Sequence, residues 1–220
     1  MYESEEQQVE ALKKWWRENG RFVIAGLVVG AVAVFGWRGW VSHQQERAAA
    51  AAAQQTELYA ALQAGDTEKV QSLSAALLAQ YADTPSAVHA ALALAKVAVD
   101  KQDYAAAQEH LQWVLDNAAD EPLQLIARLR LARVLLAQDD AAAALQKLGL
   151  AEPGEFAGLY AEARGDAYVA LGDAAMARAA YEEALAALEP GVGDRSLLEM
   201  KLNELHVAPA DQATDTAIAE

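Results

Sequence analysis

LGDAAMARAAYEEAL, at residues 171–185, has three counterparts elsewhere in the 220-residue chain. The counterparts are QDDAAAALQKLGLA (138–151), KQDYAAAQEHLQWVL (101–115) and AGDTEKVQSLSAALL (64–78). Their alignment yields four equivalent turn positions, separated by 37, 37 and 33 residues: Gly65, Gln102, Asp139 and Gly172. Periods of this size are typical of stacked helix pairs, because one pair alone cannot bury its apolar face. Helix-forming Ala, Leu, Gln and Glu dominate the chain beyond Val41, so we predict an all-α solenoid.

Small residues recur where the two helices of each pair should cross. Gly165 and Ala177 occupy these positions in the last unit, residues 158–190. The equivalent upstream pairs are Ala132 with Ala144 and Ala95 with Ala107. Small side chains are needed there because crossing helices lie only about 8–10 Å apart. This last unit resembles a tetratricopeptide (TPR) repeat, whose other pattern residues here are Tyr168, Gly172, Tyr181, Ala184 and Pro190. Residues 47–82 match poorly, as a capping unit would; a helical bundle with an alanine-rich core is the alternative.

FVIAGLVVGAVAVFGWRGWV, residues 22–41, is the one segment of the sequence long and apolar enough to cross a bilayer. At about 1.5 Å per residue, twenty helical residues span roughly the 30 Å of a hydrocarbon core. Arg38 lies near the end of the segment, where its guanidinium can reach the headgroups. Tryptophans flank the segment on both sides, as in interfacial aromatic belts: Trp15, Trp16, Trp37 and Trp40. We therefore predict a transmembrane helix rather than a buried core helix.

The flanks of this segment argue against cleavage and indicate its orientation. A signal peptide cleaved near Ala48 to Ala53 is the rival interpretation, but the preceding region is long and carries five acidic residues. Four basic residues precede the segment and two, Arg38 and Arg47, follow it closely, which favours a cytoplasmic N-terminus. We expect the following organisation: a cytoplasmic amphipathic stub at 1–21, a transmembrane helix at 22–41, a periplasmic TPR-like domain at 42–206 and a disordered tail at 207–220.

The negative charge of the chain lies entirely on one side of the apolar segment. Residues 1–41 contain five basic and five acidic side chains, so the net charge of −15 belongs to residues 42–220. A domain this acidic repels phosphate backbones, and we therefore expect no nucleic-acid partner. The chain has no cysteine, which excludes disulfides and thiolate metal sites.

No motif in the sequence indicates an enzyme, a cofactor or a metal site. The four histidines, His43, His89, His110 and His206, show no ligand spacing. The sequence also lacks the G-x-S-x-G, H-E-x-x-H and glycine-rich phosphate-loop patterns. Gly26 and Gly30 lie four residues apart inside the apolar segment. Either they form a contact with another membrane helix, or the lipid environment simply tolerates them.

The TPR resemblance also supplies candidate binding residues, because four positions of each first helix line the concave face of such a domain. In this register they include His89, Leu92, Lys96 and Val99, then Leu129, Arg133 and Leu136, then Glu162 and Asp166. Lys96 and Arg133 occupy equivalent positions in consecutive repeats of an acidic domain. Beside apolar side chains they suit an extended segment or a chain's carboxylate. The alternative is that they pair with local Asp and Glu and only keep the face soluble.

Four segments carry a resemblance to one family: QVEALKKWWRENGR (8–21), GWRGW (36–40) with the SHQ that follows, RLRLARVLLAQ (128–138) and LLEMKLNEL (197–205). With the order of stub, anchor and acidic repeats, the chain resembles the YfgM-type ancillary SecYEG translocon subunits of bacterial inner membranes. The departures are the AAAAAA run (48–53) and the tail from Val207. The resemblance implies a single-pass inner-membrane adaptor beside SecYEG, working with a periplasmic prolyl-isomerase-like chaperone and passing on translocated chains.

Two other function classes remain open. One is an envelope assembly scaffold that forms a homo-oligomer through its alanine-rich faces. The other is a regulator whose stub binds a cytoplasmic partner through Val9, Leu12, Trp15 and Trp16. In none of these readings do we expect enzymatic activity.

Overall fold

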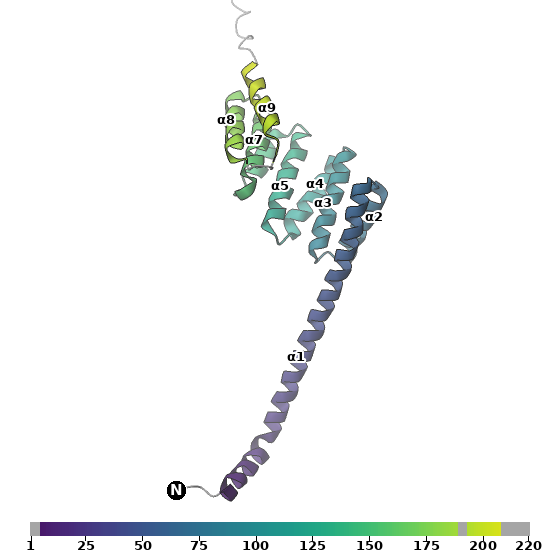
Figure 1. Ribbon diagram of the computed structural model, residues 1–220, viewed down its shortest axis with the longest axis vertical. Helices are drawn as coiled ribbons and strands as arrows, with labels where there is room; N and C mark the ends of the chain where they lie inside the picture. The colour runs from purple at the N-terminus through teal and green to yellow at the C-terminus, as the bar shows by residue number, and fades with distance from the viewer. Residues whose placement is uncertain (1–4, 189–192, 208–220) are drawn as a thin grey trace, which may run out of the picture. The chain divides into compact units, whose positions relative to one another are not determined.

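The computed structural model describes residues 5–188 and 193–207, and all regular structure within these ranges is helical. The elements follow one another along the chain without a strand between them in the described ranges (Figure 1). They are α1 (Glu5–Ala64), α2 (Thr67–Gln80), α3 (Pro85–Asp100), α4 (Tyr104–Asn117), α5 (Glu121–Leu136), α6 (Ala141–Leu148), the 3₁₀ turn η1 (Gly154–Phe156), α7 (Ala157–Ala170), α8 (Ala174–Ala187) and α9 (Arg195–Val207). The expected all-α class is confirmed.

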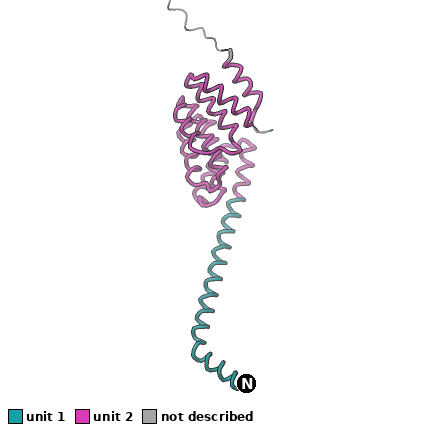
Figure 2. The backbone as a smooth tube through the Cα atoms, turned by 90° about the vertical axis from the view of Figure 1, so that its left-hand side faces the viewer, with its two compact units in different colours: residues 1–52 teal, residues 53–220 magenta. Residues whose placement is uncertain are grey.

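The chain divides into two compact units, residues 1–52 and residues 53–220 (Figure 2). Unit 1 contains the apolar segment and the described part of the expected stub. Unit 2 contains the repeats, except for residues 47–52 at the start of the first one. Val207, the first residue of the expected tail, ends α9, and residues 208–220 lie outside the described residues. Pro190 of the last repeat also lies outside them.

The turn inside each helix pair has one conformation that recurs four times. The four turn positions aligned from the sequence all have positive φ: 71° at Gly65, 60° at Gln102, 61° at Asp139 and 77° at Gly172. An Asp follows each of them, and its backbone N–H bonds to the carbonyl five residues back, as in a Schellman motif. Its carboxylate then accepts the N–H three residues ahead and caps the next helix. The four capping residues are Asp66, Asp103, Asp140 and Asp173.

The same two residues precede α9, where the sequence comparison did not find them. Gly193 has a φ of 77°, and Asp194 accepts a hydrogen bond from the N–H of Leu197 at 3.1 Å. The terminal helix is therefore started by the same local chemistry as the repeats. Its Leu198 is fully buried among Ala161, Tyr181 and Ala184, so α9 completes the core of the last pair.

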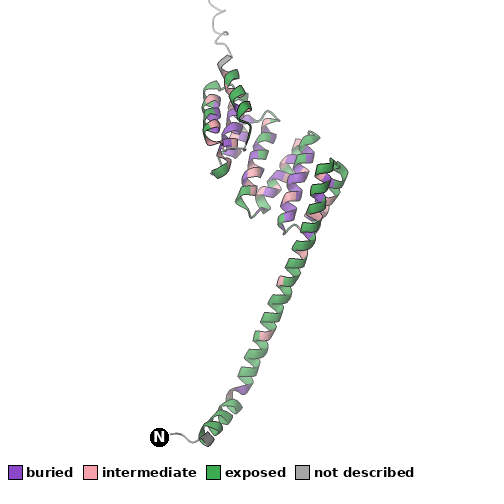
Figure 3. Ribbon diagram, viewed as in Figure 1, coloured by how far each residue is buried: buried purple, intermediate pink, exposed green. Residues whose placement is uncertain are grey.

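The helices of unit 2 stack in the order of the chain. From α2 to α9 each helix contacts the next, and α5 also contacts α7 across the short α6. Figure 3 shows buried residues on the sides of these helices that face their neighbours. At the N-terminal end of the stack, Gln55 of α1 accepts a hydrogen bond from Ser86 of α3 at 2.7 Å. This arrangement confirms the expected solenoid of stacked helix pairs.

The residues at the predicted crossing positions are buried between the helices. The five alanines at these positions are at most 2% exposed: Ala95, Ala107, Ala132, Ala144 and Ala177. Gly165 is the tightest position, because a Cβ atom there would overlap the ring of Tyr181. Glycine is required at this point by space rather than by backbone conformation.

The helix in unit 1 is apolar and almost fully exposed. Among the described residues one helix, within Gln7–Ala64, is long and apolar enough to cross a membrane, and only 6% of its most apolar window is buried. Exposed large side chains lie along it, among them Phe22, Leu27, Val29, Phe35 and Trp37. A core helix of a water-soluble protein would bury such residues.

Candidate partner-binding groove

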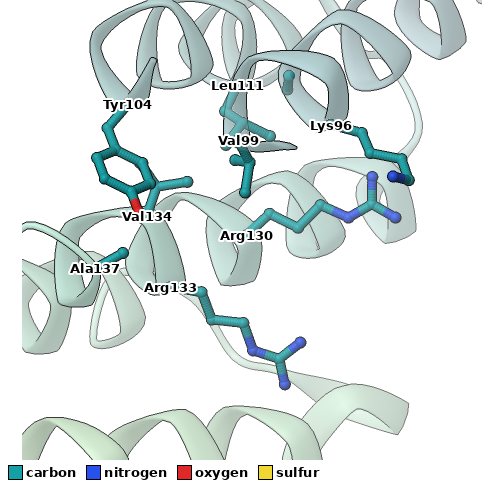
Figure 4. Close-up of a pocket in the computed structure, with 9 residues that line it drawn as sticks. Lys96, Val99, Tyr104, Leu111, Arg130, Arg133, Val134 and Ala137 are labelled. Atoms are coloured by element: carbon teal, nitrogen blue, oxygen red, sulfur yellow. The ribbon is translucent and has the colours of Figure 1, made fainter. Parts of the chain in front are cut away.

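A pocket of about 350 Å³ opens between α3, α4 and α5 (Figure 4). We term it the basic pocket, and its lining residues are Ala95, Lys96, Val99, Tyr104, Leu111, Arg130, Arg133, Val134 and Ala137. The walls are apolar, with Leu111 and Val134 buried at the base. Three cations, Lys96, Arg130 and Arg133, stand around these walls.

Helical spacing brings these residues to one place. Counted from Arg130, the residues three, four and seven positions later are Arg133, Val134 and Ala137, the last of which caps α5. At this spacing the four residues lie on one face of the helix. Lys96 and Val99 are three residues apart on α3 and face the same opening. Because α3 and α5 are first helices of consecutive pairs, the repeat sets their faces side by side.

The three cations of the pocket differ in their partners. The ammonium of Lys96 pairs with Asp100 on its own helix at 2.6 Å, and both side chains are mostly exposed. The Arg133 guanidinium lies 3.7 Å from a carboxylate oxygen of Glu162. Within the described ranges, Arg130 forms no ion pair or hydrogen bond through its side chain. Arg130 is exposed overall, but partial burial and then the neighbouring charge of Arg133 lower the pKa of its guanidinium from the usual value.

A second hollow, the acidic hollow, adjoins the basic pocket and shares Arg133 and Ala137 with it. Its other lining residues are Leu136, Glu162, Asp166, Ala170 and Leu197. Lys201 of α9 donates to Glu162 at 2.9 Å and to Asp166 at 2.7 Å. Tyr181 of α8 also donates to Asp166, at 2.7 Å. The carboxylates of this hollow are therefore already matched by cations and a hydroxyl of the same chain.

These contacts shift two of the groups involved. Burial by itself lowers the pKa of Lys201, but its hydrogen bonds to Asp166 and Glu162 outweigh burial and the pKa is raised. The pKa of Tyr181 is raised as well, first by burial and then by its hydrogen bond to Asp166. Both groups are held in their protonated forms.

The structure brings together only part of the residues expected to bind a partner. Lys96, Val99 and Arg133 line the basic pocket, and Leu136, Glu162 and Asp166 line the acidic hollow. Three candidates line neither: Leu92 and Leu129 are buried in the core, and half-buried His89 stands edge-on to the ring of Tyr59. Burial lowers the pKa of His89, partly offset by the charge of Asp120. Both cations of the expected pair also form the local ion pairs considered as the alternative.

Sequence reasoning missed Arg130 and Tyr104, which lie in the pocket. Arg130 could have been found, because it precedes Arg133 by three residues and must share its face. Tyr104 begins the second helix of its pair, and the register of first-helix positions carries no information about it.

Gly26 and Gly30 lie on the exposed helix of unit 1. A Cβ atom added at either would meet nothing within 4 Å. The surface there is open, so another helix can approach its backbone closely.

Comparison with known proteins places the chain among translocon-associated proteins. A family model described as a tetratricopeptide repeat-like domain matches residues 13–207. The chain is 35% identical over 202 residues to the ancillary SecYEG translocon subunit of Haemophilus influenzae. The aligned residues make up 91% of this chain and 97% of the Haemophilus protein. It is 33% identical over 208 residues to the subunit of the same name in Escherichia coli, covering 94% and 99%. These relatives carry the name of a translocon subunit rather than of an enzyme. The chain belongs to the family of ancillary SecYEG translocon subunits, with a tetratricopeptide repeat-like domain.

Proposed function

We propose that the protein is a membrane-tethered adaptor of the SecYEG translocon that binds protein partners through its periplasmic TPR-like domain. The observation that carries the proposal is the extent of the family match. Residues 13–207 include both the apolar helix and the repeats, so the match to proteins named as translocon subunits extends over both parts of the chain.

The helix of unit 1 supports a transmembrane anchor at residues 22–41. Its apolar side chains are exposed on all sides, as lipid contact requires. Trp16 and Trp37 are separated by about 32 Å along a helix, close to the thickness of a hydrocarbon core. The excess of Lys and Arg before the segment supports a cytoplasmic N-terminus and a periplasmic domain. The protein would then be a single-pass protein of the bacterial inner membrane.

The groove of unit 2, which consists of the basic pocket and the acidic hollow, supports partner binding. Apolar walls with a few convergent polar groups are typical of binding sites. A periplasmic chaperone of the prolyl-isomerase type is the expected partner, and passing translocated chains to it is the expected role. The membrane helix would raise the effective concentration of the groove beside the channel, so that modest affinity suffices.

Photocrosslinking in intact cells tests this function. A photoreactive amino acid would replace Leu27 or Phe35 in the helix, Val99 at the rim of the basic pocket, or Gln71 on α2 as a control. We expect SecYEG subunits crosslinked from the helix and a periplasmic chaperone crosslinked from Val99 but not from Gln71. Crosslinks only to further copies of this chain would instead indicate an envelope scaffold. Cytosolic partners captured by Val99 would reverse the proposed orientation.

Gly26 and Gly30 are the proposed contact with a membrane helix of the channel. The double variant Gly26→Ile/Gly30→Ile fills the open surface and should reduce co-purification of SecYEG subunits in mild detergent. Val28→Phe adds bulk on the opposite face of the helix and serves as the control. Equal recovery of SecYEG with both variants would show that the glycines are only tolerated.

A further inference from the structure

We propose that the basic pocket binds the C-terminal carboxylate of a partner protein, with the apolar side chain of its last residue seated between α3, α4 and α5. This inference rests on the proposed function, since it identifies what the groove recognises in a partner. It does not depend on which protein the partner is.

The apolar part of the pocket is built and open. Leu111 and Val134 form a buried base, while Val99 is 38% exposed and Tyr104 is half-buried. A volume of about 350 Å³ lies within the range of ligand-binding pockets. An apolar side chain entering this space would remove both Val99 and itself from water.

The charge around the pocket is complementary to an anion. Figure 4 shows the Arg130 side chain extending toward Lys96, whereas Arg133 extends away from both. Asp100 pairs with Lys96 and Glu162 with Arg133, whereas Arg130, which is exposed, has no acidic partner within the described ranges. An arriving carboxylate would provide the bidentate partner that a guanidinium prefers.

The acidic hollow does not offer an equivalent anchor. Lys201 and Arg133 offset Glu162 and Asp166 within the chain itself. The excess charge of the groove therefore lies at Arg130. Because the hollow shares Arg133 and Ala137 with the basic pocket, it offers a path for the residues that precede the terminus.

The closeness of charge and apolar wall favours a chain terminus over an internal acidic residue. At a C-terminus the carboxylate and the side chain branch from the same Cα atom, so one residue supplies both contacts. An internal Asp or Glu uses its side chain for the charge. The apolar contact must then come from a neighbour about 3.3 Å farther along an extended chain, which a single compact pocket accommodates less well.

Fluorescence polarisation with the full-length protein in detergent tests the proposal. The probes are labelled eight-residue peptides of Gly, Ser and Ala ending in Leu, one with a free carboxylate and one with a C-terminal amide. A third peptide ends in Asp-Leu-amide and carries its charge on a side chain. We expect the free acid to bind at least tenfold more tightly than both amides, about 1.4 kcal/mol.

Protein variants identify the group responsible. Arg130→Gln should weaken the free acid at least tenfold and leave the affinity of the neutral amide unchanged. Arg130→Lys keeps the charge but loses the planar fork, so we expect intermediate affinity. Lys69→Gln removes the same charge from exposed α2 and should change nothing. Circular dichroism of each variant checks the fold, and the comparison of acid with amide on the wild type needs no variant.

Several outcomes would overturn the inference: equal affinity for acid and amide, no detectable binding of any peptide, or an unchanged preference in Arg130→Gln. Equal binding of the Asp-Leu-amide and the free acid would assign the pocket to internal acidic segments instead. The proposed function is tested separately, because Arg130→Gln should still co-purify with SecYEG through the membrane helix. If the wild type binds the acid and amide peptides equally well but still co-purifies with SecYEG, the inference is refuted and the proposed function is not.

Discussion

Gln102 and Asp139 have the backbone conformation that glycine adopts at the equivalent turns. Their φ angles of 60° and 61° are close to the 71° of Gly65 and 77° of Gly172. A side chain in this left-handed region is strained by about 1–2 kcal/mol. The solenoid tolerates this strain because the Schellman bonds and the Asp cap on either side determine the turn.

Gln102→Gly should therefore stabilise the protein. The release of strain exceeds the loss of backbone entropy that glycine brings, which is about 0.5–1 kcal/mol, so we expect a gain of up to about 1 kcal/mol. The measurement is the midpoint of thermal unfolding, followed by the helical signal in circular dichroism. The reciprocal control, Gly172→Gln, should lower the midpoint. A lower midpoint for Gln102→Gly would mean that the glutamine side chain stabilises the turn in a way that backbone strain does not capture.

Gly165 presents the opposite case, since here space limits the side chain. Gly165→Ala should destabilise the protein by about 1–3 kcal/mol, because the added methyl group must displace the ring of Tyr181. Denaturant unfolding would measure the change in free energy. Glu182→Ala, on the exposed face of α8, is the control and should have little effect. A tolerated Gly165→Ala would mean that α7 and α8 can separate without loss.

At the scale of the elements, α9 is held to α7 by charge as well as by apolar packing. Lys201 is only 21% exposed and contacts two carboxylates of α7, Glu162 and Asp166. Removing it would leave Glu162, which is 8% exposed, with only the longer contact from Arg133. The terminal helix thus caps the stack, and its attachment depends on Lys201 being protonated.

Lys201→Met should lower the free energy of unfolding by about 2 kcal/mol at neutral pH, because charge-assisted hydrogen bonds are lost. The pKa of Lys201 is raised on folding, so its stabilisation is complete below the unfolded value of about 10.5 and disappears as pH rises through the folded value. Unfolding of wild type and variant from pH 7 to pH 12 checks this. The difference between them should be constant at first and shrink above about pH 10.5. A difference that does not depend on pH throughout would assign the effect to packing.

At the scale of the whole molecule, the chain separates an almost neutral N-terminal region from a strongly acidic remainder. The net charge of −15 lies entirely beyond residue 41. Unit 1 exposes apolar side chains, whereas unit 2 buries an alanine-rich core. These surfaces suit two different solvents, lipid and water.

Protease added to spheroplasts should digest unit 2 and leave a membrane-protected fragment that contains residues 1–41. The reason is the proposed orientation, with the four basic residues before the apolar helix retained in the cytoplasm. Immunoblotting against tags at the two ends would follow the fragments, with a cytoplasmic protein as the control for cell integrity. Protection of unit 2 would reverse the topology. A new N-terminus near Ala50 with release of the domain would indicate a cleaved signal peptide.

The sequence by itself determined the local and periodic features of this protein. The repeat located the four turns, which have positive φ, and the crossing positions around Gly165. The uninterrupted apolar run located the helix long enough to cross a membrane. Each of these features depends on residues near one another in the chain. The TPR resemblance also indicated which face of α3 and α5 carries Lys96 and Arg133.

Only the tertiary structure decided which of those face residues reach the groove. Leu92 and Leu129 share the predicted positions, but neighbouring helices cover them, and coverage depends on the packing of the whole stack. Glu162 and Asp166 meet Lys201 from 39 and 35 residues away, a pairing that no local pattern encodes. Arg130 stands without an acidic partner in the described structure, although Arg133, three residues later, pairs with Glu162 of α7. Charge pairing across elements is set by three-dimensional distance, and sequence spacing does not contain it.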